Sequence, residues 1–336
     1  MSRLLFIFIT TALLISCSFD PIRIDLAGGW SVKSLVAFRH TNPQSITASK
    51  DGKWLYISLE NSAGLSTPSL ATINMATGHH QILLNGLHLA HGLQIAPDTS
   101  LWIGEQFEQG MIWRISEPGK LPEDQRIERT TLAVTHPSIA PLPAAGRFTH
   151  SGFAFSQDGR FAYMAGADSQ GRLYRYTLRS RKLQVLHAQE GWLSITNPES
   201  ADAEATHLKA RAFTPLRGVT VLPNGHILIA EPAKGRLLEL DDSSEHPELS
   251  TYLDDAELQQ PVDLAWDTAR QWLWISDGYK PSRLWAYDGN RLNRIASHKE
   301  ARITGLAVHG ETVYLNLRDN GQSPEITLKL TETDTP

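Results

Sequence analysis

The chain has 336 residues, of which 41% are apolar and 20% charged, an ordinary globular composition. Its net charge of −5 and its lack of dense lysine or arginine runs argue against a nucleic-acid partner. Length alone predicts about two domains, but the repeats described below fill a single one.

The N-terminal segment has the features of an export signal. Arg3 precedes about twelve apolar residues, which are too few to cross a bilayer but suit the core of a signal peptide. They end at Leu14-Ile15-Ser16-Cys17, which resembles the lipobox of bacterial lipoproteins, where the cysteine is acylated and becomes the first residue after cleavage. Cys17 is the only cysteine of the chain, so lipidation accounts for an otherwise unpaired thiol in an exported protein.

This resemblance implies a signal peptide over residues 1–16 and a lipidated tether over residues 17–28. The lipid bilayer is then a partner through acylated Cys17, because several acyl chains on one residue anchor a protein firmly. Ser18 follows the cysteine, and in lipoproteins of double-membraned bacteria this favours the outer membrane, facing the periplasm. The alternative is a buried N-terminal helix with an incidental cysteine.

From residue 29 onward one pattern recurs along the chain. Each copy is a short apolar run, a turn that is often Asp-Gly or Asn-Gly, and a second apolar run, as in Phe153–Gly166. The other five copies span 46–60, 93–105, 219–231, 264–277 and 306–316. Hairpins that recur about every 40 to 65 residues indicate a repeat architecture, here a β-propeller.

Each unit continues beyond its hairpin with outer strands that alternate polar and apolar residues, as half-buried strands do. The last unit lacks a fourth strand, because a polar tail follows residues 325–330. The segment 29–38 is strand-like and otherwise unpartnered, so we expect it to complete the final blade. The sequence thus predicts an all-β, six-bladed β-propeller of four-stranded antiparallel blades over residues 29–332, its ring closed by an N-terminal strand.

Two insertions interrupt the regular spacing. Residues 116–148 are rich in proline, and residues 189–213 form a second long excursion. Loops longer than about 12–15 residues are uncommon unless they are functional or disordered. The two insertions therefore either cover the mouth of the ring or are plain surface excursions.

The candidate site lies at one end of the central channel. Each antiparallel hairpin places the start of its first strand and the end of its second strand at the same rim, with the turn at the opposite face. Aligning the units on their first-strand glycines gives the mouth residues Gln44, His91, Ser151, Arg217, Val262 and Thr304, with His150 and Asp263 beside them. The ends of the second strands add Glu60, Glu105, Glu231 and Asp277. Polar groups converging on a concave mouth are typical of a ligand site, although they would also simply hydrate the end of a channel.

His91 and His150 are the candidate catalytic residues, because a histidine can act as a general base near neutral pH. A single histidine at a strand start is nevertheless more often structural. His88 and His91 form an H-x-x-H on a predicted loop, which is weak evidence for a metal. Ser151 follows His150 directly, but neighbours on a strand point to opposite faces, so adjacency does not make it a nucleophile.

Across about residues 40–330 the chain resembles the six-bladed TolB-like propeller superfamily. Within it, the chain is most similar to the SMP-30/gluconolactonase/strictosidine-synthase-like proteins and the NHL-repeat proteins. The likeness is carried by the segments Arg147–Arg160 and Pro261–Asp267. The blade pattern is specific for the fold and only weakly specific for an activity.

Gluconolactonase-like enzymes hold a divalent ion, often calcium, through Glu, Asn and Asp residues just before the first-strand glycines. The matching positions here are Gln44, Ser151, Arg217 and Val262. Calcium prefers about six to eight oxygen ligands, several of them charged, so an arginine argues against the same site. Asp263, Glu105 and Glu231 are candidates to rebuild one. Arg217 is instead suited to holding a carboxylate or phosphate through paired hydrogen bonds.

Two functions stay open. The first is a membrane-tethered propeller whose mouth or side binds a small anionic molecule, a glycan or a protein partner, with His91, Arg217 and Asp263 as mouth residues; convergence of these side chains with His150 would instead favour an enzyme. Gln44, Ser151, Thr304, Glu105 and Glu231 are further ligand-binding candidates under this hypothesis. The second is a lactone or ester hydrolase in which His91 or His150 is the base and a bound ion or Arg217 polarises the carbonyl. An outer-membrane assembly factor, a third alternative, fits the blade pattern less well.

Overall fold

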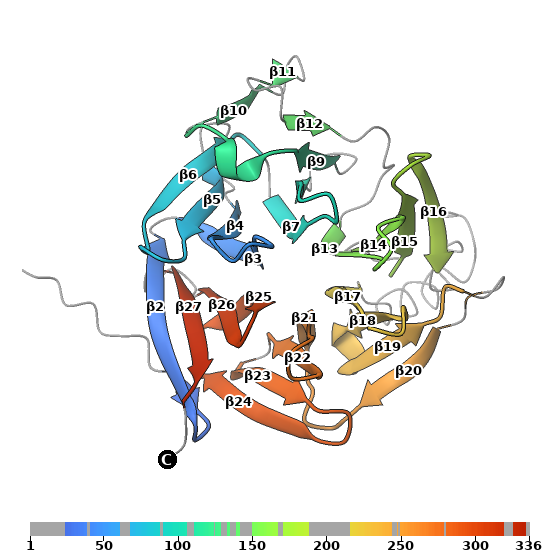
Figure 1. The fold of residues 1–336 in the computed structure, drawn as a ribbon. Helices are drawn as coiled ribbons and strands as arrows, with labels where there is room; N and C mark the ends of the chain where they lie inside the picture. The colour runs from blue at the N-terminus through green and yellow to red at the C-terminus, as the bar shows by residue number, and fades with distance from the viewer. Residues whose placement is uncertain are drawn as a thin grey trace, which may run out of the picture.

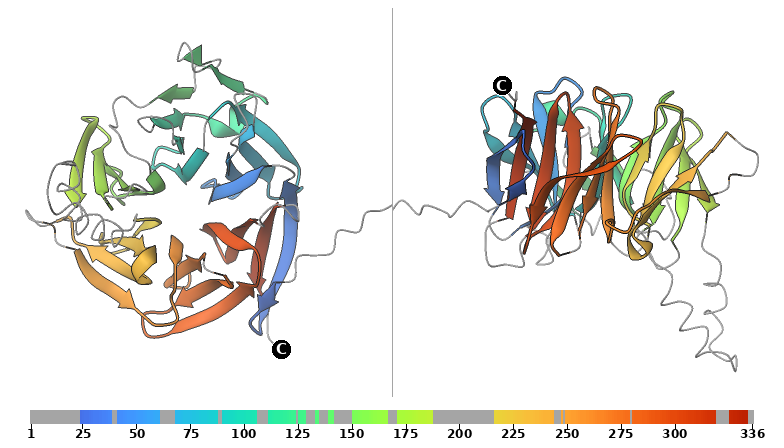
Figure 2. Two further views of the ribbon diagram at one scale, coloured as in Figure 1. Left: turned by 180° about the vertical axis from the view of Figure 1, so that it is seen from behind. Right: turned by 90° about the horizontal axis from the view of Figure 1, so that it is seen from below.

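The computed structural model describes residues 24–38, 41–60, 68–87, 90–105, 111–123, 125–128, 133–134, 139–141, 150–166, 171–187, 216–243, 247, 249–278, 280–318 and 325–333. Six antiparallel sheets surround a central axis as the blades of a propeller (Figure 1). The side view shows the blades standing next to one another around the ring (Figure 2). The prediction of an all-β, six-bladed propeller is confirmed.

Each of the first three blades has its first strand innermost and steps outward from there. Blade 1 contains β3 (Asn42–Ala48), β4 (Trp54–Glu60), β5 (Pro68–Asn74) and β6 (His80–Asn85). Blade 2 contains β7 (Ala90–Ile95), β8 (Leu101–Glu105), β9 (Met111–Ile115) and β12 (Ile139–Pro141). Blade 3 contains β13 (His150–Phe155), β14 (Phe161–Gly166), β15 (Leu173–Thr177) and β16 (Lys182–His187).

The other three blades follow the same plan. Blade 4 contains β17 (Val219–Val221), β18 (Ile227–Glu231), β19 (Arg236–Leu240) and β20 (Leu249–Asp254). Blade 5 contains β21 (Pro261–Asp267), β22 (Trp272–Asp277), β23 (Ser282–Tyr287) and β24 (Leu292–His298). Blade 6 contains β25 (Arg302–His309), β26 (Thr312–Arg318), β27 (Glu325–Glu332) and β2 (Trp30–Phe38).

Helical structure is slight in this fold. The described residues contain two single turns of 3₁₀ helix, η1 (Pro118–Lys120) and η2 (Pro232–Lys234), each with a proline at its start. Within the described part of the chain, no helix is long and apolar enough to span a membrane.

The hydrophobic core lies in the seams between neighbouring blades. Each of six apolar clusters combines side chains of two adjacent blades, so every seam of the ring has its own core. The second strands are packed on both faces, and β8 and β18 are buried along their whole length. Continuous apolar runs such as Ile227–Ala230 therefore read as uniformly buried strands rather than as alternating ones.

The Asp-Gly turns are built alike in blades 1 and 3. The hydroxyl of Ser49 donates to Asp51 at 2.7 Å, and Ser156 donates to Asp158 at 2.7 Å. The glycine after each aspartate has a positive φ, 67° at Gly52 and 68° at Gly159. Residues with a Cβ atom are strained in this backbone conformation, and glycine is not. These turns fix the register of the hairpins, so they fix where the strand ends meet at the channel.

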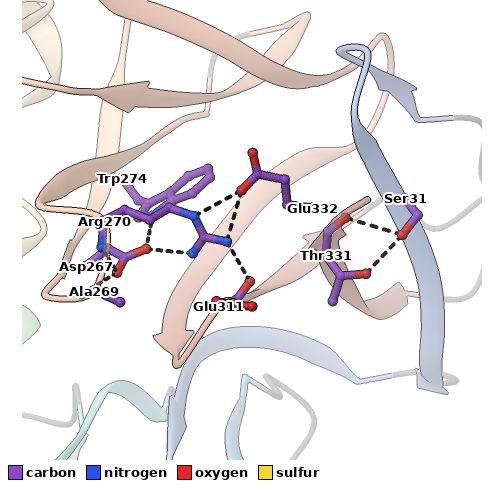
Figure 3. Close-up of polar contacts among 8 residues, drawn as sticks. All are labelled: Ser31, Asp267, Ala269, Arg270, Trp274, Glu311, Thr331 and Glu332. Carbon is purple, nitrogen blue, oxygen red and sulfur yellow. Dashed lines mark hydrogen bonds and ion pairs between the residues drawn. The ribbon is translucent and has the colours of Figure 1, made fainter. Parts of the chain in front are cut away.

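The N-terminal strand closes the ring, as the sequence predicts. Strand β2 pairs antiparallel with β27 from Trp30 opposite Glu332 to Phe38 opposite Glu325. Ser31 bonds to Thr331 next to this seam (Figure 3). Blade 6 thus joins β2, a strand from near the N-terminus, to β27, the last described strand of the chain.

A buried arginine ties blade 5 to this closing blade. Arg270 donates to Asp267 at 3.0 Å, to Glu332 at 3.3 Å and to the carbonyl of Glu311 at 3.1 Å (Figure 3). Its guanidinium also lies 5.7 Å from the centre of the Trp30 ring. Because Asp267 is only 1% exposed, the pair is desolvated and each member depends on the other.

The strands that the first insertion forms lie on the outside of the ring (Figure 1). Strand β12 is the fourth strand of blade 2, paired with β9. Strand β10 (Gln125–Glu128) runs parallel to β6 and carries β11 (Ala133–Val134) beyond it, so blade 1 is extended outward. These segments supply strands rather than a cover over the mouth, because a blade left with three strands exposes an edge. Residues 189–213 lie outside the described residues.

The chain reaches β2 by crossing blade 5. Strand β1 (Asp25–Leu26), within the segment expected to form the tether, pairs with β24 on the outer edge of that blade. The amide of Ala27 donates to the carbonyl of Ile295 at 2.8 Å. Residues 25–38 therefore contact two adjacent blades.

Candidate functional site

The innermost strands meet most closely at the aligned position of the first strands. We call the six residues at this position the glycine ring: Ser45, Gly92, Gly152, Gly218, Asp263 and Gly305. A Cβ atom on Gly218 would lie 2.6 Å from the Cα of Asp263, and one on Gly305 would lie 2.3 Å from the carbonyl oxygen of Gln44. These glycines are needed for close backbone approach. In five blades the strand register also shifts next to this position.

Three arginines and a histidine gather on the strand-start side of this ring, and we call this group the cationic mouth: His91, Arg217, Arg302 and Arg318. Arg302 and Arg318 lie directly opposite each other on β25 and β26. Like charges facing each other across a ladder destabilise a sheet. Arg318 is balanced by Glu60, with 2.9 Å between the guanidinium and the carboxylate. Among the described residues, neither Arg217 nor Arg302 has a carboxylate within ion-pair distance.

The charges of the cationic mouth act on one another. Burial, together with the positive charges of Arg217 and Arg318, lowers the pKa of His91 to about 4. Burial lowers the pKa of Arg217 as well, with a contribution from Arg302. At neutral pH His91 is therefore an uncharged imidazole beside a half-buried guanidinium.

Asp263, expected from the sequence beside the mouth residues, lies apart from His91 and Arg217. Its carboxylate accepts the backbone N–H groups of Leu264 and Leu306, each at 3.0 Å. It lines a cavity on the turn side of the glycine ring, and neither His91 nor Arg217 lines that cavity. Burial raises the pKa of Asp263 to about 7, and no neighbouring charge contributes. The aspartate and the arginine therefore face opposite ends of the channel.

The acidic residues at the ends of the second strands lie inside the blades. Glu105 and Glu231 are each 1% exposed. Glu105 accepts the indole N–H of Trp113 at 2.7 Å, and Glu231 accepts from Arg236 at 2.6 Å with Lys234 2.9 Å away. This corrects the expectation that both carboxylates face a ligand at the mouth. Buried carboxylates need such partners, and these hold the ends of β8 and β18 in place.

The remaining predicted residues connect blades or lie partly outside the description. Gln44 donates its amide to Glu60 at 2.5 Å, so both support Arg318. The Thr304 hydroxyl donates to the carbonyl of Pro43 at 2.7 Å, across the seam between blades 6 and 1. His150 and Ser151 lie at the start of β13, and their side chains are outside the described residues, as are His88 and Cys17.

The residues present do not fit the calcium site that the resemblance implies. Within the described ranges, no three His, Cys, Asp or Glu side chains lie close enough to hold a metal ion. Of the four matching positions, Arg217 is a cation, Gln44 directs its amide nitrogen at Glu60, and Val262 packs where a Cβ on Gly278 would lie, 2.7 Å away. Hard divalent cations need several oxygen donors, which this set does not supply.

Sequence reasoning missed Arg302 and Arg318. Arg302 precedes the predicted mouth residue Thr304 by two positions and is the first residue of β25. The last predicted hairpin ends at Asn316, and Arg318 lies two residues beyond that end. Pairing the two strands on paper would have placed two arginines face to face, a signal that is available without a structure.

Comparison with known proteins places the fold. No protein-family model matches the chain, and no curated protein matches its sequence. Among solved structures, a gluconolactonase from Xanthomonas campestris is similar with a TM-score of 0.59 and 12% identity, over 93% of this chain and 94% of that one. A luciferin-regenerating enzyme is similar with a TM-score of 0.61 and 10% identity, over 90% and 95%.

A virginiamycin B lyase from Staphylococcus aureus, an inactive variant with quinupristin, is similar with a TM-score of 0.52 and 15% identity, over 90% and 99% of the two chains. Identities this low establish the fold and not the activity. The chain therefore has the six-bladed β-propeller fold that it shares with these solved structures.

Proposed function

We propose that the cationic mouth binds a small anionic molecule, with Arg217 as its main contact. The observation that carries this proposal is a half-buried guanidinium next to other cations, with no carboxylate partner among the described residues. A buried charge is costly without a partner. An anion bound here would offset the free-energy cost of burying the Arg217 charge and would reduce its repulsion by Arg302.

The chemistry of the mouth favours a carboxylate or a phosphate. A guanidinium presents parallel N–H groups that match two oxygens of either anion. The described mouth holds three arginines and one carboxylate, Glu60, which is already bound to Arg318 and Gln44. His91 adds a neutral imidazole that can donate or accept one further hydrogen bond.

The test is anion binding measured by calorimetry and by thermal stabilisation, with inorganic phosphate, sulfate and gluconate as probes. We expect Arg217→Gln to weaken the affinity for the best of these anions by about tenfold or more, because it removes a charge-assisted pair. Arg294→Gln, an exposed arginine on β24, is the matched control and should bind as the wild type does. Equal affinity in both variants, or no binding of any probe, would overturn the proposal.

A lactone or ester hydrolase is the second candidate, favoured by the neutral state of His91 next to Arg217. In this mechanism His91 takes a proton from water, and the resulting hydroxide attacks the carbonyl carbon. Arg217 then stabilises the oxyanion. The carbon–oxygen bond of the ring breaks, and His91 returns the proton to the departing alkoxide, giving a hydroxy acid. A pKa near 4 makes the imidazole a weak base, which favours binding as the main proposal.

Hydrolysis can be tested with glucono-1,5-lactone and p-nitrophenyl acetate. If His91 is the base, kcat/KM should rise through pH 4 and stay level toward neutral pH, because the neutral imidazole is the active form. His91→Gln should abolish this rise while thermal denaturation shows a folded protein. Turnover no faster than the buffer blank would exclude this candidate and leave anion binding intact.

We also propose that the propeller is anchored to a bacterial envelope membrane through acylated Cys17. The support is the lipobox-like motif that ends in the only cysteine of the chain. Cys17→Ser should abolish incorporation of labelled palmitate and release the protein from the membrane fraction. Labelling that persists in this variant would contradict the proposal. Fractionation of the two membranes of a double-membraned host tests the expected outer-membrane location.

A further inference from the structure

The turn side of the central channel contains a cavity that the mouth proposal does not use. Its volume is about 770 Å³, which is within the range of small-molecule sites. All six innermost strands contribute to its wall, from the glycine ring to the hairpin turns. His91, Arg217, Arg302 and Arg318 do not line it. The cavity is therefore a separate compartment from the cationic mouth.

The wall of this cavity is rich in hydrogen-bond acceptors. The six innermost strands are terminal strands of their sheets, so their free edges turn backbone groups toward the axis. Hydroxyl and amide side chains add to them, with Thr47 donating to the oxygen of Gln94 at 2.8 Å and Thr220 lining the wall nearby. Such a wall suits a polar molecule that donates hydrogen bonds.

Asp263 is the acidic group of this cavity. Four other blades have glycine and one has serine at its position. Of the residues that line the cavity, the titratable ones are Asp263, Lys50 and His309. Lys50 donates to the carbonyl of Pro97 at 2.6 Å near the turns, and His309 packs where a Cβ on Gly52 would lie. The deep part of the wall thus has one carboxylate and no cation.

The carboxylate of Asp263 has bonding capacity left. Each of its oxygens accepts one backbone N–H group, one from Leu264 and one from Leu306. A carboxylate oxygen can accept two hydrogen bonds, so each has a second site free of these two donors. Burial without an opposing charge raises the pKa of Asp263 to about 7. A bound cation would offset that cost.

We propose that this cavity is a second binding site, for a small organic ammonium compound, with Asp263 as its counter-ion. The ammonium group would donate to the Asp263 carboxylate at the deep end. Its carbon chain would lie against apolar wall residues such as Phe153, Leu264 and Leu306. The site is independent of the anion site on the other side of the glycine ring.

Affinity for an ammonium compound should depend on pH in one direction. Below about pH 7 Asp263 takes up a proton, so affinity should fall about tenfold for each further pH unit. The other ionisable groups on the strands and turns around it are Lys50, Asp267 and His309 at the turn end, and Arg217, Asp277 and Arg302 on the far side. None of them shifts the pKa of Asp263. An Asp263→Asn variant should show no such dependence between pH 6 and 8.

The experiment is calorimetric titration at pH 8 with n-butylammonium and 1,4-diaminobutane, with 1-butanol as the neutral control. We expect an amine to bind the wild type and 1-butanol not to bind. Asp263→Asn, and Asp263→Gly, which restores the glycine of the other blades, should each weaken amine binding by about tenfold or more. Arg217→Gln, which should disturb only the mouth, is expected to bind the amine as the wild type does.

Four results would overturn the proposal. Wild-type affinity in Asp263→Asn would show that this aspartate only joins blades 5 and 6 through Leu306. Displacement of the amine by equal concentrations of sodium or potassium would assign the site to an inorganic cation. Lack of binding of either amine to the wild type is the third. Loss of amine binding in Arg217→Gln is the fourth, because it would merge this site with the mouth.

Discussion

The two ends of the channel are built from the same six strands and carry opposite charges. On the strand-start side, Arg217, Arg302 and Arg318 surround a neutral His91. On the turn side, a cavity contains Asp263 and no deep cation. The glycine ring separates the two ends. Arg217 lies one position before the ring residue of its own blade, and Asp263 lies in the ring itself. This difference of one position places their side chains in different compartments.

This contrast shows how a repeat architecture acquires polarity without losing its symmetry. The aligned position is glycine in four blades because the backbones touch there. Asp263 breaks that rule, and its side chain takes over a backbone contact by accepting the N–H of Leu306 in the next blade. The exception therefore has a structural role as well as an electrostatic one.

The largest effect should come from a side chain added to the glycine ring, where the inner strands touch between the two ends of the channel. In Gly305→Ala the new Cβ would lie 2.3 Å from the carbonyl oxygen of Gln44, which is backbone and cannot rotate away. We expect the free energy of unfolding to fall by at least about 3 kcal/mol, the upper end of the usual range for overpacking. Urea denaturation measures this change.

Gly28→Ala is the control for this substitution, since no atom lies within 4 Å of the added Cβ. It should stay within about 0.5 kcal/mol of the wild type, as surface substitutions do. A small loss in Gly305→Ala, equal to that of the control, would mean that the inner strands are not in contact at this level.

Acid should destabilise the protein through His91. Its pKa is 6.5 when unfolded and about 4 when folded, so as pH falls from 6.5 to 4 only the unfolded chain takes up the proton. Stability is lost in that window, by about 3 kcal/mol for this group. His91→Gln removes this loss, so the difference in unfolding free energy between variant and wild type should grow by that amount from pH 7.5 to 4. A constant difference would show that His91 is not buried uncharged.

Asp263 should act in the opposite direction. Its pKa is raised from 3.8 to about 7, so as pH rises through this window the unfolded chain loses its proton first and the folded state loses stability. By linkage, the raised pKa of Asp263 costs the wild type up to about 4 kcal/mol of unfolding free energy at high pH. Asp263→Asn removes this cost but loses one hydrogen bond, which lowers the gain by about 1–2 kcal/mol. We expect Asp263→Asn to be more stable than the wild type by about 2 kcal/mol at pH 8, with no gain at pH 3.5. A variant less stable at both pH values would contradict this.

The two slopes oppose each other between pH 4 and 6.5. The wild type should therefore be nearly level there, while each single variant shows the slope of the group that remains. The same denaturation experiment, done on the two single variants, therefore measures the pH dependence due to His91 and that due to Asp263 separately.

The smallest effect should be electrostatic coupling within the mouth. Burial is the main cause of the low pKa of His91, and the charges of Arg217 and Arg318 are secondary. Arg217→Met should therefore raise that pKa by less than about one pH unit, the range of a single partly screened charge. Proton NMR of the imidazole measures it, and Asp263→Asn should leave it unchanged. A rise to 6.5 would mean that charge and not burial controls His91.

Much of the fold follows from local sequence. The Asp-Gly turns and the apolar runs between them identify six hairpins, because turn chemistry and burial act over a few residues. The unpartnered segment 29–38 also predicts the closing strand, which is confirmed as β2. The outer strand β12 was missed, since only three residues pair and proline dominates the segment around them.

The site is less accessible to sequence reasoning. Aligning the blades finds the right level of the channel, but it does not tell which side of the glycine ring a side chain takes. Asp263 and Arg217 are aligned one position apart, and this step sends them to opposite ends. Glu105 and Glu231 were assigned to the mouth because hairpin geometry places the ends of the second strands at that rim, whereas their bonds to Trp113 and Arg236 hold both carboxylates inside the blades.

The path of residues 25–38 has a mechanical consequence. A pull on the chain before residue 24 loads the two-residue ladder of β1 and the Ala27 bond to Ile295 before it reaches the nine-residue strand β2. The short ladder can peel from blade 5 and re-form without opening the ring, because the seam between β2 and β27 is still intact. Strand β1 would therefore detach before β2 carries the force, so a propeller held by its N-terminus would keep its channel shape under tension.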